Sequence, residues 1–196
     1  MGRTCFVVAA VMLVAGSREA QAQRISVIRC MPSVMTSVGV NTNGDRNGEQ
    51  TSRGADAAAA FEMPVSRRWS ARADAGSVVW TFQERDYRTE AVLWQERIRV
   101  RRVMVSAIQR SPDCGSPFRP YAGFGVGVYQ YAYRDQHVNV TTGGVHGVFG
   151  LDVMAQERLA FTGEVGIHAI NGPRRDPVFS VVLWSLRATV GARIVF

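Results

Sequence analysis

The last twelve residues of the chain, Ser185–Phe196, read SLRATVGARIVF, and they decide the fold. Taken in steps of two, one face of this stretch carries only apolar side chains, whereas the other is polar, charged or glycine apart from Val195. This two-residue period is typical of a β-strand that lies between an apolar medium and a polar one. The chain also stops on an aromatic residue. The remaining question is which medium each face meets.

The N-terminus indicates export. Residues 1–22 combine a basic Arg3, a short apolar run over Cys5–Ala15 and a small-residue cleavage site that ends at Ala22. We interpret them as a secretory signal peptide, because the apolar run is far shorter than the ~20 residues that a membrane-spanning helix needs. Residues 23–196 are then expected to form a single domain.

The composition narrows the class of protein further. No later segment reaches ~18 consecutive apolar residues, so no spanning helix is expected. All 23 basic residues are arginine, and the formal net charge is +7. Because these arginines are scattered through strand-like segments of an exported chain, we expect no nucleic-acid partner. The excess positive charge suits a position beside anionic lipid headgroups.

Turn-rich stretches divide the chain into eight strand-like runs without a sustained helical period. Short turns alternate with longer connections, which is the pattern of an outer-membrane barrel whose even number of strands puts both termini on the short-turn side. The predicted runs are Ser33–Val40, Gly54–Val65, Trp69–Phe82, Glu96–Gln109, Phe118–Tyr133, Gly143–Met154, Arg158–Ala169 and Leu183–Phe196.

Alternation alone leaves open a soluble barrel, apolar inside, and a membrane barrel, apolar outside. Charges of both signs gather on the polar faces, which favours the membrane. Their near-balance predicts ion pairs that plug the lumen, because eight strands enclose little more than side chains and an unpaired buried charge is costly. A continuous water channel is the alternative. The predicted lumen network is Asp56, Glu62, Arg72, Asp74, Arg97, Arg99, Asp152, Glu164, Arg187 and Arg193.

Two further features favour the membrane. Glycines share the polar faces, as expected where a narrow interior needs small residues beside large ones. Aromatic residues lie near the strand ends in two groups that resemble interfacial girdles. The predicted girdles are Trp69, Phe118 and Tyr121 at the turn side, and Trp80, Tyr133 and Trp184 at the loop side.

The fourth run contains one conflict in the pattern. Ile98 and Val100 are expected to face lipid, which would send Arg102 into lipid as well. We therefore predict a β-bulge at Arg101–Arg102, since it would turn both arginines inward. Elsewhere, the side chains expected to face lipid include Phe61, Val126, Phe149, Leu151, Phe161, Val190 and Ile194.

Three stretches carry a family resemblance: Pro64–Arg72, Pro120–Val128 and Val190–Phe196. They resemble the small outer-membrane β-barrel family, the OmpA/OmpX-type transmembrane domain, and the resemblance covers nearly all of the exported chain. It implies an all-β, eight-stranded, antiparallel up-and-down transmembrane barrel in the outer membrane. It also implies that Phe196 is a signal for the barrel-assembly machinery. No specific activity follows from it, and we expect a monomer surrounded by outer-membrane lipid.

Candidate catalytic and metal-binding residues are few. His146 and His168 fall on the lumen face, but no His-Glu-x-x-His or Cys-x-x-Cys motif accompanies them, so no metal or cofactor is expected. The stretch from His168 to Asn171 is similar to the His-x-Ser-Asn of outer-membrane lipid A deacylases. The serine position is Ile170 here, which cannot attack a carbonyl.

We therefore expect an envelope protein that is not an enzyme and that has a structural or surface-interaction role, with its surface ligand unidentified. A small pore or a carrier for small apolar molecules is the alternative, and a deacylase-like enzyme is a second one.

The two cysteines of the exported chain, Cys30 and Cys114, are both expected at the periplasmic rim, where the compartment is oxidising. A disulfide would require residues 23–32 to cross the barrel mouth and the two Cα atoms to approach within about 7 Å. Two separate thiols are the alternative.

Overall fold

The computed structural model describes residues 31–44, 51–66, 68–85, 92–111, 116–133, 138–171 and 182–196. The predicted signal peptide, the Cys30–Cys114 pair and His137 lie outside these residues. Within them, no helix is long and apolar enough to cross a membrane.

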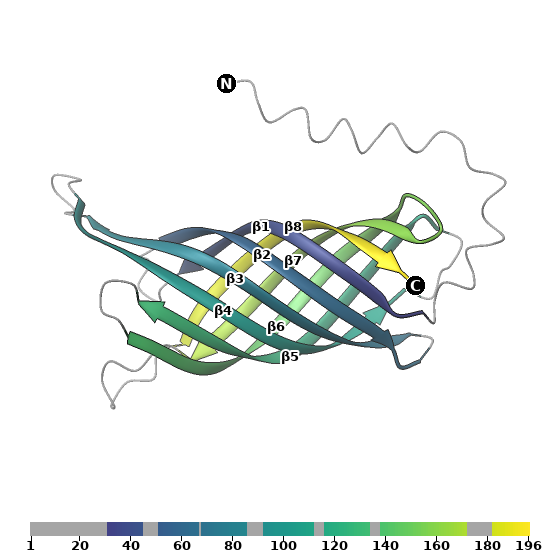
Figure 1. Ribbon diagram of the computed structural model, residues 1–196, viewed down its shortest axis with the longest axis horizontal. Coiled ribbons are helices and arrows are strands. Elements are labelled where there is room, and N and C mark those ends of the chain that lie inside the picture. The colour runs from purple at the N-terminus through teal and green to yellow at the C-terminus, as the bar shows by residue number, and fades with distance from the viewer. Residues whose placement is uncertain are drawn as a thin grey trace, which may run out of the picture.

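Eight antiparallel strands close into one barrel in chain order, so that β1 pairs with both β2 and β8. Figure 1 shows the strands winding around a common axis, with the C-terminus beside the start of β1. The strands are β1 (Ser33–Gly44), β2 (Thr51–Pro64), β3 (Trp69–Arg85), β4 (Val92–Arg110), β5 (Phe118–Tyr133), β6 (Val138–Met154), β7 (Leu159–Asn171) and β8 (Val182–Val195). This confirms the predicted eight-stranded up-and-down barrel.

The two ends of the barrel differ. At the turn end lie Met31, Phe196 and the turns that follow β2, β4 and β6; at the loop end lie the connections that follow β1, β3, β5 and β7. The strands run further toward the loop end than predicted, and the β3–β4 ladder continues to Arg85↔Val92. The predicted strand ends were placed where the apolar alternation stops. Backbone hydrogen bonds between strands do not require that alternation, so the pairing continues beyond it. We assign the turn end to the periplasmic side.

The strands are staggered around the barrel. Paired residues can be followed around the barrel from Val38 in two directions. The row that passes through β2 to β5 reaches β6 at Thr141, whereas the row that passes through β8 and β7 reaches β6 at Leu151. Because β6 runs from the loop end to the turn end, rows rise toward the loop end from β1 to β6. With strands tilted by about 40°, each residue spans roughly 2.5 Å of the axis and each strand-to-strand step roughly 3 Å.

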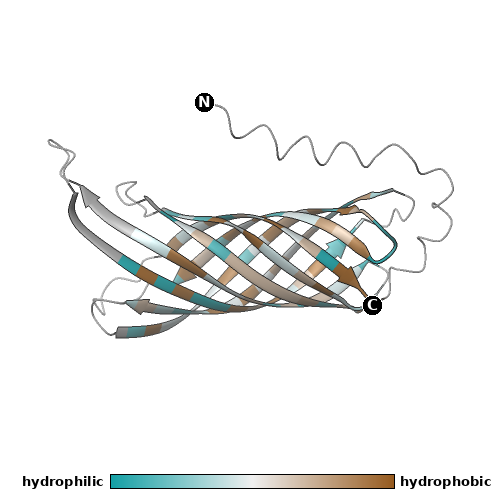
Figure 2. Ribbon diagram, turned by 45° about the horizontal axis from the view of Figure 1, so that its top comes forward, coloured by the Kyte–Doolittle hydropathy of each residue, from teal (hydrophilic) through white to brown (hydrophobic). Residues whose placement is uncertain are grey.

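Buried and exposed side chains alternate along the described parts of the strands. Figure 2 shows hydrophilic and hydrophobic residues following one another along the ribbon. In the terminal strand, Val190 and Ile194 are exposed, whereas Arg187 and Arg193 are buried. The predicted facing is confirmed for the whole set of lipid-facing residues, which are Phe61, Val126, Phe149, Leu151, Phe161, Val190 and Ile194. The barrel is thus apolar outside and charged inside.

Candidate functional site

The interior is the candidate functional site, because the buried charges of the described chain gather there. Five of the interior arginines and five interior carboxylates form ion pairs with one another. Eight belong to the predicted lumen network, and Arg102 and Arg110 join them. The ten residues are Asp56, Glu62, Arg72, Asp74, Arg102, Arg110, Asp152, Glu164, Arg187 and Arg193.

A turn-end cluster joins five strands. Arg110 from β4 donates two hydrogen bonds to Glu62 on β2, both of 2.8 Å, and a third of 2.7 Å to Asp152 on β6. Arg193 from β8 donates to Glu62 at 2.7 Å and to the Ser33 hydroxyl at 3.0 Å. Paired fork geometry of this kind gives the stronger class of ion pair. The cluster therefore ties the first and last strands to the far wall of the barrel.

A central cluster surrounds Glu164 on β7. Its carboxylate accepts hydrogen bonds from Arg72, from Arg187 at 2.8 Å and from the Tyr121 hydroxyl at 2.7 Å. Arg72 also contacts Asp74 at 3.3 Å. Strands β3, β5, β7 and β8 are thereby joined across the middle of the barrel.

Arg102 and Asp56 form a third, separate pair. The guanidinium nitrogens Nη1 and Nη2 lie 2.6 and 2.7 Å from the two carboxylate oxygens, so the pairing is bidentate. Both side chains are buried. Gly76 leaves the space that this arginine fills, since a Cβ there would lie 2.7 Å from the Nη2 atom of Arg102.

Two histidines on β6 and β7 lie beside these ion pairs, where they share a small hollow with Arg72, Asp74 and Arg187. His146 and His168 stack with their ring centroids 5.5 Å apart. The Ser106 hydroxyl lies 2.9 Å from Nε2 of His146, and the Tyr129 hydroxyl lies 2.9 Å from Nδ1 of His168. Among the described residues, no group of three or more His, Cys, Asp or Glu side chains could hold a metal ion.

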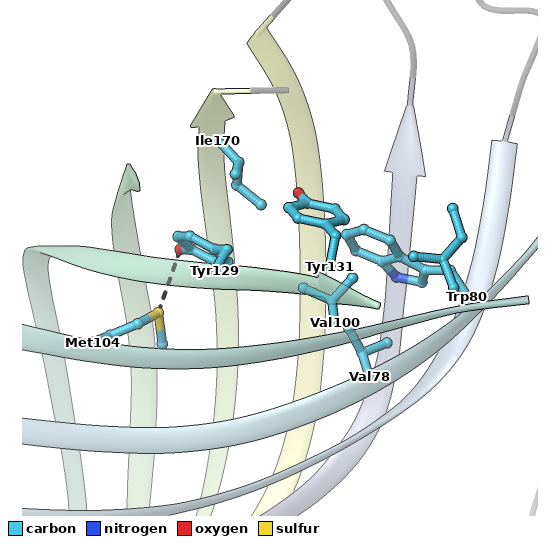
Figure 3. Close-up of a cluster of buried hydrophobic side chains, with 8 residues drawn as sticks. Val78, Trp80, Val100, Met104, Tyr129, Tyr131 and Ile170 are labelled. Atoms are coloured by element: carbon cyan, nitrogen blue, oxygen red, sulfur yellow. Dashed lines mark hydrogen bonds between the residues drawn. The ribbon is translucent and has the colours of Figure 1, made fainter. Parts of the chain in front are cut away.

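An apolar cluster fills the loop end of the interior. Figure 3 shows Trp80 and Tyr131 facing one another among aliphatic side chains from neighbouring strands. Their ring centroids are 6.0 Å apart. The buried members are Val78, Trp80, Ile98, Val100, Met104, Tyr129, Tyr131 and Ile170.

The spaces left in the described interior are small. A hollow of about 10 Å³ adjoins the histidine pair, and one of about 70 Å³ opens at the turn end beside Glu62 and Arg110. One water molecule needs about 10–15 Å³ by the same measure. Side chains therefore occupy the described lumen through most of its length.

The prediction for β4 was wrong. Arg97 and Arg99 lie on the outer surface and are exposed, so they do not belong to the lumen network. The ladders on both sides of β4 run without a bulge past Arg101, which faces out, and Arg102, which faces in. The unbroken alternation of Ile98 and Val100 with the arginines carries these apolar side chains inward.

The reason is that the interior beside the loop end of β4 is apolar. Ile98 and Val100 pack against Trp80 and Tyr131, and so they are buried inside rather than in lipid. The sequence did contain a sign of this arrangement. If β4 alternates without a bulge and Val103 faces outward, then Arg102 and Arg110 must both face inward.

The predicted girdles are only partly present. Trp69 and Phe118 at the turn end and Trp184 at the loop end are exposed on the outer surface. Trp80, Tyr121 and Tyr133 instead occupy interior positions, where the first two are buried and Tyr133 packs against the apolar cluster. Large rings are needed inside because glycines leave space there, as at Gly150 opposite Tyr121.

An apolar belt outside a closed ladder with charges inside defines an integral membrane β-barrel, since closure leaves no backbone polar group unpaired in lipid. No protein-family model matches the sequence, and no characterised protein compared with it is detectably similar in sequence. Solved structures do match.

Neisserial surface protein A superposes with a TM-score of 0.64 at 12% identity, over 84% of this chain and 97% of that protein. OprG from Pseudomonas aeruginosa gives 0.60 at 14% identity over 86% and 97%, and AlkL gives 0.51 at 15% over 85% and 90%. These neighbours are small outer-membrane barrels. The protein therefore has the fold of the small eight-stranded outer-membrane β-barrels, as predicted.

Proposed function

We propose that the protein is a non-conducting barrel that serves the cell envelope as a structural element and presents its loop-end connections for surface interaction. The observation that carries this proposal is the filled lumen, which is occupied by three ion-paired groups, a histidine pair and an apolar cluster. Ions crossing it would have to separate buried charge pairs, which is costly.

The test is electrical. Purified, folded protein is inserted into planar bilayers, with a general porin as the positive control for insertion and detection. We expect no steady single-channel current from the wild type in 1 M salt. A stable, reproducible conductance that scales with salt concentration would contradict the proposal.

A carrier for small apolar molecules is the second candidate, and the apolar loop-end cluster favours it. Trp80 and Tyr131 line that part of the interior, so an apolar solute would meet matching surface there if the cluster opened. The measurement is uptake of an apolar probe into vesicles that contain the wild type, a Trp80→Ala variant or no protein. Uptake with the wild type above the protein-free rate, increased by Trp80→Ala, would favour the carrier.

We further propose that the protein has no lipid A deacylase activity. His168 is buried inside the barrel against His146, away from the surface that meets lipid, and Ile170 packs into the apolar cluster. Neither residue is placed to meet an acyl ester in the outer leaflet. Mass spectrometry of lipid A from cells with and without the protein tests this, and loss of an acyl chain upon expression would contradict it.

A further inference from the structure

Four arginines form a patch on the outer surface near the loop end. Arg97, Arg99 and Arg101 occupy successive outward positions of β4, and Arg53 is the outward residue at the same end of β2. Thr81 of β3 joins them, because it pairs with Arg53 on one side and with Arg97 on the other. The four arginines therefore flank this end of β3 from both sides, and we call them the outer arginine patch.

The outer arginine patch has no acidic counterpart on the described wall. The outward positions described for the eight strands contain these four arginines and no aspartate or glutamate. All five buried carboxylates face the interior and are paired with other arginines. Among the ion pairs found in the described chain, none involves an arginine of the patch.

The stagger of the strands sets the height of the patch in the membrane. Along the axis, Arg101 lies roughly 12 Å above Val190, Arg99 roughly 17 Å and Arg53 roughly 16 Å above it, toward the loop end. The exposed ring of Trp184 lies roughly 15 Å above Val190 by the same geometry. Because tryptophan marks the membrane interface, the patch lies at the headgroups of the outer leaflet.

The wall beneath the patch is apolar and shallow. On β2 and β3, the outward positions below Arg53 and Thr81 are mostly small, including Ala57, Ala59, Ala73 and Ala75. Valines stand higher on both sides of them. These are Val38 and Val40 on β1 and Val103 and Val105 on β4. We call this strip of mostly small apolar side chains, which Val79 interrupts just below Thr81, the trough.

We propose that the outer arginine patch and the trough bind a phosphorylated glycolipid of the outer leaflet, of the lipid A type. Guanidinium groups bind phosphate through paired, charge-assisted hydrogen bonds, and the trough offers apolar surface to acyl chains directly below. Arginines on β2 and β4, the two strands that flank β3, suit a headgroup with two phosphates better than the single phosphate of a glycerophospholipid. Lipid phosphates supply the negative charge that the described wall lacks.

The test compares two double variants by native mass spectrometry in a neutral detergent, titrated with hexa-acyl diphosphoryl lipid A. Arg99→Gln/Arg101→Gln removes two charges from the patch. The matched control, Arg68→Gln/Arg158→Gln, removes two exposed arginine charges from the turn end. We expect the patch variant to bind at least tenfold more weakly than the wild type and the control to stay within twofold. Heat-modifiable gel mobility checks that all three proteins are folded.

Ligand variation tests the wild type directly and needs no mutation. Lipid A without its phosphates should bind at least tenfold more weakly, and phosphatidylglycerol should also bind more weakly. Equal affinity for the dephosphorylated lipid, equal affinity for phosphatidylglycerol, or equal loss in the two double variants would each overturn the proposal.

Discussion

At the scale of single residues, one register position gives two neighbouring arginines opposite environments. Arg101 is exposed at the lipid-facing wall, whereas Arg102 is buried in a bidentate pair with Asp56. Secondary structure does not distinguish them, because both lie in the same regular strand. The alternation of the strand decides which charge is desolvated by protein and which by the membrane interface.

Replacement of Arg102 should be strongly destabilising. Arg102→Met leaves the Asp56 carboxylate buried without a partner, which costs about 3–5 kcal/mol of unfolding free energy. The measurement is urea-induced unfolding in phosphatidylcholine vesicles, followed by tryptophan fluorescence. Arg101→Met is the matched control and should change stability by less than about 1 kcal/mol, because charges near the interface contribute little.

Removal of both partners separates a lost pair from an orphaned charge. Arg102→Met/Asp56→Leu should recover most of the lost stability, since apolar replacement of a whole buried pair is often neutral. A double variant as unstable as Arg102→Met alone would contradict this account.

Two glycines on neighbouring strands offer a second residue-scale test. A Cβ at Gly150 would overlap the ring of Tyr121, whose hydroxyl is fixed by Glu164 and Thr162, whereas a Cβ at Gly163 meets nothing within 4 Å. Gly150→Ala should cost about 1–3 kcal/mol through overpacking, and Gly163→Ala should be neutral or slightly stabilising. The same unfolding assay measures both, and equal effects would contradict the packing described here.

At the scale of secondary structure elements, strand tilt determines the depth of each side chain. The three outward arginines of β4 are accommodated because rows rise toward the loop end from β1 to β4. Val190 occupies the row of Arg101, yet its strand lies lower, near the middle of the apolar belt. The row that contains Val190 and Arg101 thus begins in the lipid interior at β8 and reaches the headgroup region at β4.

Arginine substitution at two depths tests this geometry. Val190→Arg should cost about 2–4 kcal/mol, because it places a charge near the midplane of the lipid-facing wall. Asn171→Arg, exposed at the loop end of β7, should cost no more than about 1 kcal/mol. Unfolding in vesicles measures both, with folding yield as a second readout. Equal costs would contradict the tilt or the facing.

At the scale of the whole molecule, several groups of side chains, which we call layers, close the interior together. The turn-end cluster, the central cluster, the Arg102–Asp56 pair, the histidines and the apolar cluster each join strands across the lumen. Closure therefore depends on no single layer.

Removal of one layer should leave the barrel closed. Arg102→Ser/Asp56→Ser removes the bulk of the isolated pair and leaves no unpaired charge, so we expect no steady current in planar bilayers. Folded protein, verified by gel mobility, is required for the comparison. A stable channel in this variant would mean that the pair alone blocks ion flow and that the other layers do not.

The amino-acid sequence by itself determined the barrel, its facing and most of its strands. Alternation as regular as that of Ser185–Phe196 requires an apolar medium on one side, and a two-residue period admits only two facings. Eight residues of the lumen network were found on this basis, because their strands alternate without interruption. The predicted outer-membrane barrel follows from the same pattern.

The tertiary structure alone decided which face of β4 points to the membrane and which points into the lumen. One face of β4 combines Arg97, Arg99 and Arg101 with Val103 and Val105. The other face combines Ile98 and Val100 with Arg102, so hydropathy alone does not say which face meets lipid. The decision came from contacts between strands: Trp80 and Tyr131 make the loop end of the interior apolar, and the stagger raises the outward arginines to the headgroups. The two-residue period of a strand specifies neither the residues that it packs against nor its height in the membrane.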